Sequence, residues 1–223
     1  MVLKKMEKTK LPNKSTKVIA VSPIAVSPKY YISGTLPNKI FTFEQKSNGT
    51  ANIEKVIDYD FDAKILVYED RVRGWFLDFA RKLSKEKHSG FILLMICVSY
   101  LEGNQQFREG KESRQRESGE MIKRAMQRMM KIPKEYEKVL DLFISEVRCG
   151  LFHDGMTRKH ILLKDNISHP LMIDEDKEIV IISPSKLLEL IDIDLELYIK
   201  ELRNPSNREL RNNFERFWNF RYC

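Results

Sequence analysis

The stretch FILLMICVSYL, residues 91–101, is apolar on nearly every side of the helix that it would form. A helix of this composition belongs at the centre of a group of helices, because it has no broad face that suits water. The run is too short to span a bilayer. The stretch therefore predicts a mainly α protein, a helical bundle arranged around residues 91–101.

Helical spacing of apolar residues continues on both sides of this central segment. A break at His88-Ser89-Gly90 separates it from the preceding helix, and we expect an exposed loop over 103–117 and a further helix over 121–130. Pro133 suits the first turn of the next helix. The preceding stripe comprises Ile65, Tyr68, Val72, Trp75, Phe76, Phe79 and Leu83, and the stripe after Pro133 comprises Leu140, Phe143, Ile144, Val147 and Leu151.

A change of pattern after residue 158 predicts a short β-hairpin insertion. Residues 160–163 and 178–182 are rich in β-branched and apolar residues, and a further apolar segment, 170–173, lies between them. Ser183 followed by Pro184 is typical of a helix start, with a capping hydroxyl and then proline in the first turn. That helix is expected to end at Asn204.

The amino-terminal part differs from the rest. Residues 1–17 contain six Lys and one Glu, so this segment carries a charge of +5 and is expected to be a disordered basic tail. Residues 18–57 hold short strand-like runs between Pro, Gly and Asn, which predicts an irregular or small-strand appendage. The helical bundle itself is expected to occupy 58–223.

Composition limits the classes of function. The net charge is +7, and residues 108–131 contribute eight basic and four acidic side chains, so weak contact with a nucleic-acid backbone is one reading and a solvated face the other. Three scattered cysteines make neither a disulfide framework nor a zinc site. With no apolar leader behind the first lysines, we expect a cytoplasmic protein with no membrane contact, no metal and no cofactor.

Arg148 and His153 are the candidate catalytic pair. Guanidinium grips phosphate through a fixed set of donors, and imidazole moves protons near neutral pH. In a regular α-helix, five residues of spacing place the two side chains about 140° apart. They would converge if the helix loosened at Gly150 or ended near Gly155, or alternatively if two copies faced each other across a two-fold axis.

The segment Arg148–His153 resembles the Arg-x4-His signature of HEPN domains, helical bundles that often act as ribonucleases in toxin, phage-defence and CRISPR systems. Asp154-Gly155, Glu69–Arg71 with Gly74–Phe76, and Ser99–Gly103 are similar to uncharacterised bacterial members, and the likeness covers about 60–203. The resemblance implies a HEPN-like bundle and a homodimer whose cleft holds both motifs. It also implies metal-independent RNA cleavage by attack of the 2′-hydroxyl, with a cognate antitoxin as a further partner.

Other residues complete the candidate site. Glu146, Asp154 and Glu102 are possible supporting residues, although Glu146 is expected at the surface and Asp154 in solvent. The cations expected to lead RNA toward the site, or else to form a solvated face, are Lys123, Arg124, Arg128 and Lys131. The alternative to an enzyme is a non-catalytic HEPN-like module that binds a partner protein or a nucleotide. Cys149 favours it, because many active members carry a polar residue there.

Overall fold

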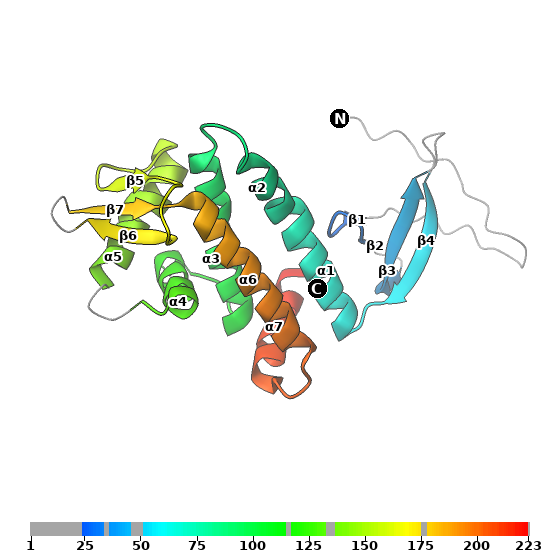
Figure 1. Cartoon of the computed structure of the whole chain (residues 1–223). Helices are drawn as coiled ribbons and strands as arrows, with labels where there is room; N and C mark the ends of the chain where they lie inside the picture. The colour runs from blue at the N-terminus through cyan, green and yellow to red at the C-terminus, as the bar shows by residue number, and fades with distance from the viewer. Residues whose placement is uncertain are drawn as a thin grey trace, which may run out of the picture. The chain divides into compact units, whose positions relative to one another are not determined.

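The computed structural model describes residues 24–33, 36–45, 51–114, 117–132, 137–174 and 178–222. The protein is mainly helical, as the sequence predicted (Figure 1). The chain divides into two compact units, Met1–Trp75 and Phe76–Cys223. The sequence analysis placed the boundary between the appendage and the helical bundle at 57/58, where strand gives way to helix. The predicted basic tail, 1–17, lies outside the described residues.

In its described residues, the first unit contains an antiparallel sheet and one α-helix. Strands β1 (Ile24–Ala25), β2 (Tyr31–Ser33), β3 (Leu36–Gln45) and β4 (Ala51–Asp58) lie side by side in chain order. Helix α1 (Phe61–Val72) begins at the cap Asp60, whose carboxylate accepts a hydrogen bond from the Ala63 amide at 2.8 Å. The segment expected to be irregular or strand-like therefore forms strands joined by a turn at 26–30 where it is described.

The turn after β1 rests on the end of α1. The Asp70 carboxylate accepts from the Lys29 amide at 2.9 Å, and Arg71 Nε donates to the Val26 carbonyl at 2.7 Å. A Cβ at Gly74 would lie 2.4 Å from Pro28 Cγ, so only glycine permits this approach. Hydrogen bonds and close packing thus fix the turn to the helix.

In the second unit, the predicted central helix is α3 (Gly90–Glu109), which packs against α4 (Ser118–Met130), α6 (Pro184–Arg203) and α7 (Arg208–Tyr222). The loop predicted over 103–117 is wrong at its start, because α3 continues to Glu109 and ends at Gly110 with a φ of +65°. Asn104, Gln105 and Gln106 are buried there. Because these residues are polar, the pattern of apolar residues did not reveal that the helix continues.

The stripe expected between Ile65 and Leu83 does not form one buried face. Trp75, Phe76 and Phe79 are exposed. A π-helical turn, η1 (Arg73–Leu77), separates α1 from α2 (Asp78–Leu83). The wider turn shifts the residues that follow it around the helix axis. Apolar residues three and four apart across this turn therefore do not lie on one face.

The β insertion has three strands, β5 (Ile161–Leu163), β6 (Leu171–Asp174) and β7 (Ile179–Ile182), in the order β5-β7-β6. Strands β6 and β7 form an antiparallel hairpin, and β5 pairs with β7 in parallel. The predicted helix start follows directly, because the Ser183 hydroxyl accepts from the Lys186 amide at 3.1 Å and Pro184 is the first residue of α6. The sheet is thus held between the candidate motif and α6.

Candidate functional site

The Arg148–His153 motif lies on a widened helix. It follows α5 (Glu137–Leu142) in two π-helical segments, η3 (Phe143–Arg148) and η4 (Gly150–Asp154). Between them the Cys149 amide donates to the Ile144 carbonyl, five residues earlier rather than four. Such π-helical segments are rare in proteins overall, but those that occur often lie at functional sites. The predicted start at Pro133 lies outside the described residues.

This widening changes the relation between Arg148 and His153. The separation of about 140° holds only for 3.6 residues per turn. In a π-helix the hydrogen bond from residue i+5 to residue i places those two residues one turn apart on the same face. Arg148 and His153 have this spacing. Of the two routes to convergence considered from sequence, loosening of the helix is the one seen within a single chain.

The face that carries the pair is open to solvent. His153 and Phe152 are exposed and Arg148 is half-buried. The guanidinium carbon of Arg148 lies 5.9 Å from the centre of the Phe152 ring. A guanidinium, an imidazole and an aromatic ring therefore lie within six residues of one another on the motif helix, and the last two are exposed.

A return loop holds the widened helix in place. Gly155 ends the helix with a φ of +73°, a conformation that favours glycine. The chain then folds back so closely that a Cβ at Gly150 would lie 2.5 Å from the Met156 carbonyl oxygen. The Arg158 amide donates to the Glu146 carbonyl at 3.1 Å. Gly150 therefore serves this close backbone approach.

Glu146 is not at the surface, so that expectation is wrong. It is only 9% exposed, and its carboxylate accepts from the His160 amide at 2.8 Å and contacts the His160 Nδ1 atom. Burial acts to raise the pKa of Glu146, but the hydrogen bonds from His160 outweigh it and hold that pKa below its usual range. His160 is thus a structural partner that the sequence analysis did not select. No local pattern marks it, because the pair joins residues from separate elements.

The other supporting candidates have partners of their own. The Asp154 carboxylate accepts from Arg158 Nε at 2.9 Å. Glu102 accepts from the hydroxyls of Ser113 and Ser118 at 2.8 and 2.7 Å, and so holds the chain that leads into α4. These contacts assign both carboxylates to local structure around the motif helix and α4.

The predicted RNA-leading cations are largely balanced by carboxylates. Arg124 pairs with Glu109 at 2.6 Å, and Lys123 pairs with Glu120 at 3.1 Å and also contacts Asp141. Lys131 ends α4 in the left-handed region, with a φ of +51°, and is exposed. This face thus has less free positive charge than its composition implied.

Arg128 belongs to a buried polar network rather than to an open basic face. It contacts the Asp194 carboxylate, which is 5% exposed and also accepts from the Tyr100 hydroxyl at 2.9 Å. Arg108 approaches the same carboxylate at 3.4 Å. The network joins α3, α4 and α6 inside the bundle.

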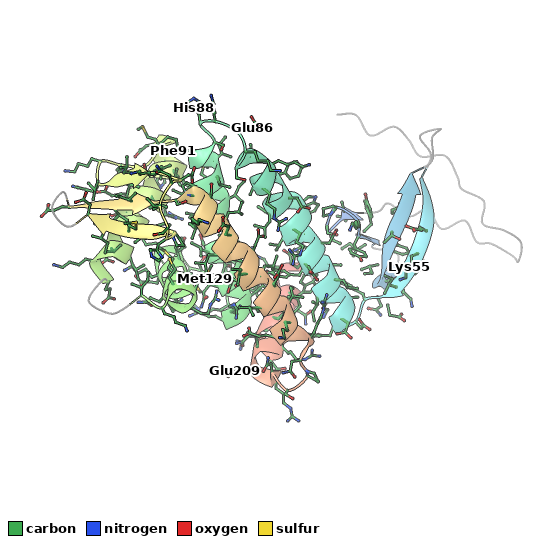
Figure 2. The ribbon with its side chains drawn as sticks, viewed as in Figure 1. Lys55, Glu86, His88, Phe91, Met129 and Glu209 are labelled. Atoms are coloured by element: carbon green, nitrogen blue, oxygen red, sulfur yellow. The ribbon has the colours of Figure 1, made fainter. Side chains whose placement is uncertain are left out.

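The methionine-rich part of α4 has two environments. Met121 and Met126 are fully buried in the core. Met129, labelled in Figure 2, and Met130 line a cavity of about 340 Å³ whose other walls come from α5, β6, α6 and the segment around His169. The motif segments 143–148 and 150–154 do not contribute lining residues to this cavity.

The described residues hold neither a candidate metal site nor a membrane-spanning helix. No group of three or more His, Cys, Asp or Glu side chains in that part of the chain is placed to hold a metal ion. None of the helices described has the length and apolar composition needed to cross a membrane. Comparison with protein families, curated proteins and solved structures found no match to this chain.

Proposed function

We propose that this protein is a metal-independent endoribonuclease of the HEPN type, and that its bundle is HEPN-like. The observation that supports the proposal is the widened helix, because its hydrogen bonds to the fifth preceding residue match the spacing of Arg148 and His153. The charge and proton-transfer chemistry of the pair suit cleavage of a phosphodiester.

The reaction would be an internal transesterification. His153 takes the proton from a ribose 2′-hydroxyl, and the resulting oxygen attacks the adjacent phosphorus while the bond to the 5′-oxygen breaks. Arg148 holds the phosphate and stabilises the negative charge that grows on its oxygens. The leaving 5′-oxygen takes a proton, so the products are a 2′,3′-cyclic phosphate and a 5′-hydroxyl.

A homodimer would divide the acid and base roles. One His153 accepts the proton of the 2′-hydroxyl, and the His153 of a second copy donates to the leaving oxygen, which leaves each imidazole ready for the opposite role. The exposed position of the motif is compatible with a second copy facing it across a two-fold axis. Light scattering at micromolar concentration is expected to give twice the 26.4 kDa chain mass, and a monomer would contradict this arrangement.

Cleavage of a single-stranded RNA in EDTA tests the activity. We expect the parent to cleave and His153→Ala to be inactive. Arg148→Lys is expected to lose most activity, because ammonium lacks the two-pronged grip of guanidinium. Because His153 is exposed and Arg148 is only half-buried, both variants should melt close to the parent. Cleavage that requires a divalent ion, or that survives both substitutions, would refute the mechanism.

A second candidate is a HEPN-like module without catalysis that binds a protein, such as an antitoxin, or a nucleotide. The carboxylate partners of Lys123, Arg124 and Arg128 favour it, because they reduce the free charge available for an RNA backbone. Under this alternative the parent does not cleave RNA under any of these conditions, while a partner protein or nucleotide raises its melting temperature.

A further inference from the structure

We propose that Phe152 is a stacking platform for one unpaired base beside the phosphate held by Arg148, so that the site selects single-stranded RNA. This inference rests on the proposed function for its choice of ligand. The ring is 47% exposed, directly precedes His153 in the chain and lies 5.9 Å from the Arg148 guanidinium carbon.

The placement of the ring gives it this role. An exposed aromatic side chain by itself needs no explanation, since much of any protein surface is apolar. Here, however, the ring lies 5.9 Å from the Arg148 guanidinium carbon and belongs to the same exposed π-helical segment as His153. A nucleotide whose phosphate contacts Arg148 therefore has its base within reach of Phe152.

The same geometry defines the substrate class. A base stacked on an aromatic ring must expose one of its flat faces. Bases inside a duplex are already stacked on both sides, whereas bases in single strands, loops and bulges are available. Stacking also accepts any base, because each has a π face. The site should therefore prefer unpaired RNA with little sequence preference at this position.

The chain offers a matched control at Phe79. That ring is 54% exposed, and the Lys82 ammonium lies 5.3 Å from its centre, so it also combines an exposed aromatic ring with a nearby cation. It lies on α2 and has no imidazole within its turn. A general effect of exposed aromatic rings on RNA binding would appear equally at both positions.

The test measures binding separately from cleavage. In the His153→Ala background, fluorescence anisotropy follows a labelled single-stranded RNA and the same strand annealed to its complement. Phe152→Leu is expected to weaken single-strand binding roughly tenfold, as loss of one stacked base predicts. Phe152→Trp should retain affinity, Phe79→Leu should match the parent, and duplex binding should not depend on Phe152.

The results that would overturn the stacking role differ from the result that would overturn the ribonuclease proposal. Unchanged single-strand affinity in Phe152→Leu, or equal weakening with duplex RNA, overturns the stacking role. A changed oligomeric state of Phe152→Leu in light scattering also overturns it, and assigns Phe152 and the nearby exposed Met156 to a protein interface instead. If Phe152 governs binding but the chain with His153 intact does not cleave, the ribonuclease proposal fails and the stacking role stands.

Discussion

The carboxylate of Glu146 accepts a hydrogen bond from the backbone amide of His160 at 2.8 Å and also contacts the Nδ1 atom of its ring. One side chain thus holds both the backbone and the ring of His160. Glu146 belongs to the widened helix, and His160 immediately precedes β5. The pair therefore joins the motif helix to the inserted sheet. Two hydrogen bonds to a buried carboxylate make this contact a main support of the motif's geometry.

Glu146→Gln is expected to lower the free energy of unfolding by about 1–3 kcal/mol at neutral pH, because a charge-assisted contact is replaced by a neutral one in a buried setting. Urea denaturation at pH 7 measures the change. Glu189→Gln is the matched control, since Glu189 pairs with Lys186 at an exposed position and should change stability little. Equal effects of the two substitutions would contradict a special role for Glu146.

The stability difference between parent and Glu146→Gln should also depend on pH. The pKa of Glu146 is lowered in the folded chain, so the carboxylate stabilises the fold fully above the ordinary glutamate pKa of about 4.3. This stabilisation is lost as the pH falls through the lowered pKa of the folded state. Melting temperatures measured from pH 7 downward should therefore converge in acid, whereas a constant difference would argue against the lowered pKa.

Gly150→Ala and Gly103→Ala should change stability in opposite directions. A Cβ at Gly150 would lie 2.5 Å from the Met156 carbonyl oxygen, so alanine forces the return loop away at a cost of about 1–3 kcal/mol. Gly103 lies inside α3 with no such neighbour within 4 Å, and alanine there should stabilise by up to about 1 kcal/mol. Chemical denaturation compares them, and a neutral Gly150→Ala would contradict the described loop packing.

Asp194→Ala should be far more destabilising than Asp192→Ala on the same helix. Removing the Asp194 carboxylate takes away the buried acidic partner of Arg128 and the acceptor of the Tyr100 hydroxyl, which is expected to cost about 3–5 kcal/mol. Asp192 pairs with Arg81 nearer the surface, and its loss should cost about 1 kcal/mol or less. Similar unfolding free energies for the two variants would contradict the buried network.

Cys97 should resist thiol reagents until the protein unfolds. Its side chain is fully buried in α3, and burial raises the pKa of its thiol far above neutral pH, so the reactive thiolate does not form. Maleimide labelling at pH 7.5 with mass spectrometry should leave Cys97 unmodified in the native chain and label it in urea. Rapid native labelling of Cys97 would show that the centre of the bundle opens.

Much of the second unit followed from sequence alone. The all-round apolar stretch 91–101 predicted the central helix α3, and Ser183 with Pro184 predicted the start of α6. β-branched runs predicted the strands between the motif and α6. These predictions succeeded because burial pattern, capping and β propensity act over a few neighbouring residues.

The candidate site depended more on tertiary structure. The sequence identified Arg148 and His153, which a regular helix would hold about 140° apart, but left open whether the helix loosens or two copies pair. It expected Glu146 at the surface and did not select His160. From Phe143 to Leu151 the fully buried side chains are at 143, 147 and 151, a spacing that an ordinary α-helix also shows. The apolar pattern therefore gave no sign of the widened helix.

The sequence by itself determined a mainly helical chain, its central helix and the β insertion, and it singled out Arg148 and His153 as the candidate pair. Only the tertiary structure decided the pitch of the motif helix and the partners of its charges. Because π-helical turns are rare, local preference favours the hydrogen bond to the fourth preceding residue, so the bond to the fifth has to be imposed by contacts outside the helix. Packing therefore decides the pitch of the helix. The contacts that do so here are the return loop against Gly150 and the hydrogen bonds between Glu146 and His160, which join residues far apart in the chain.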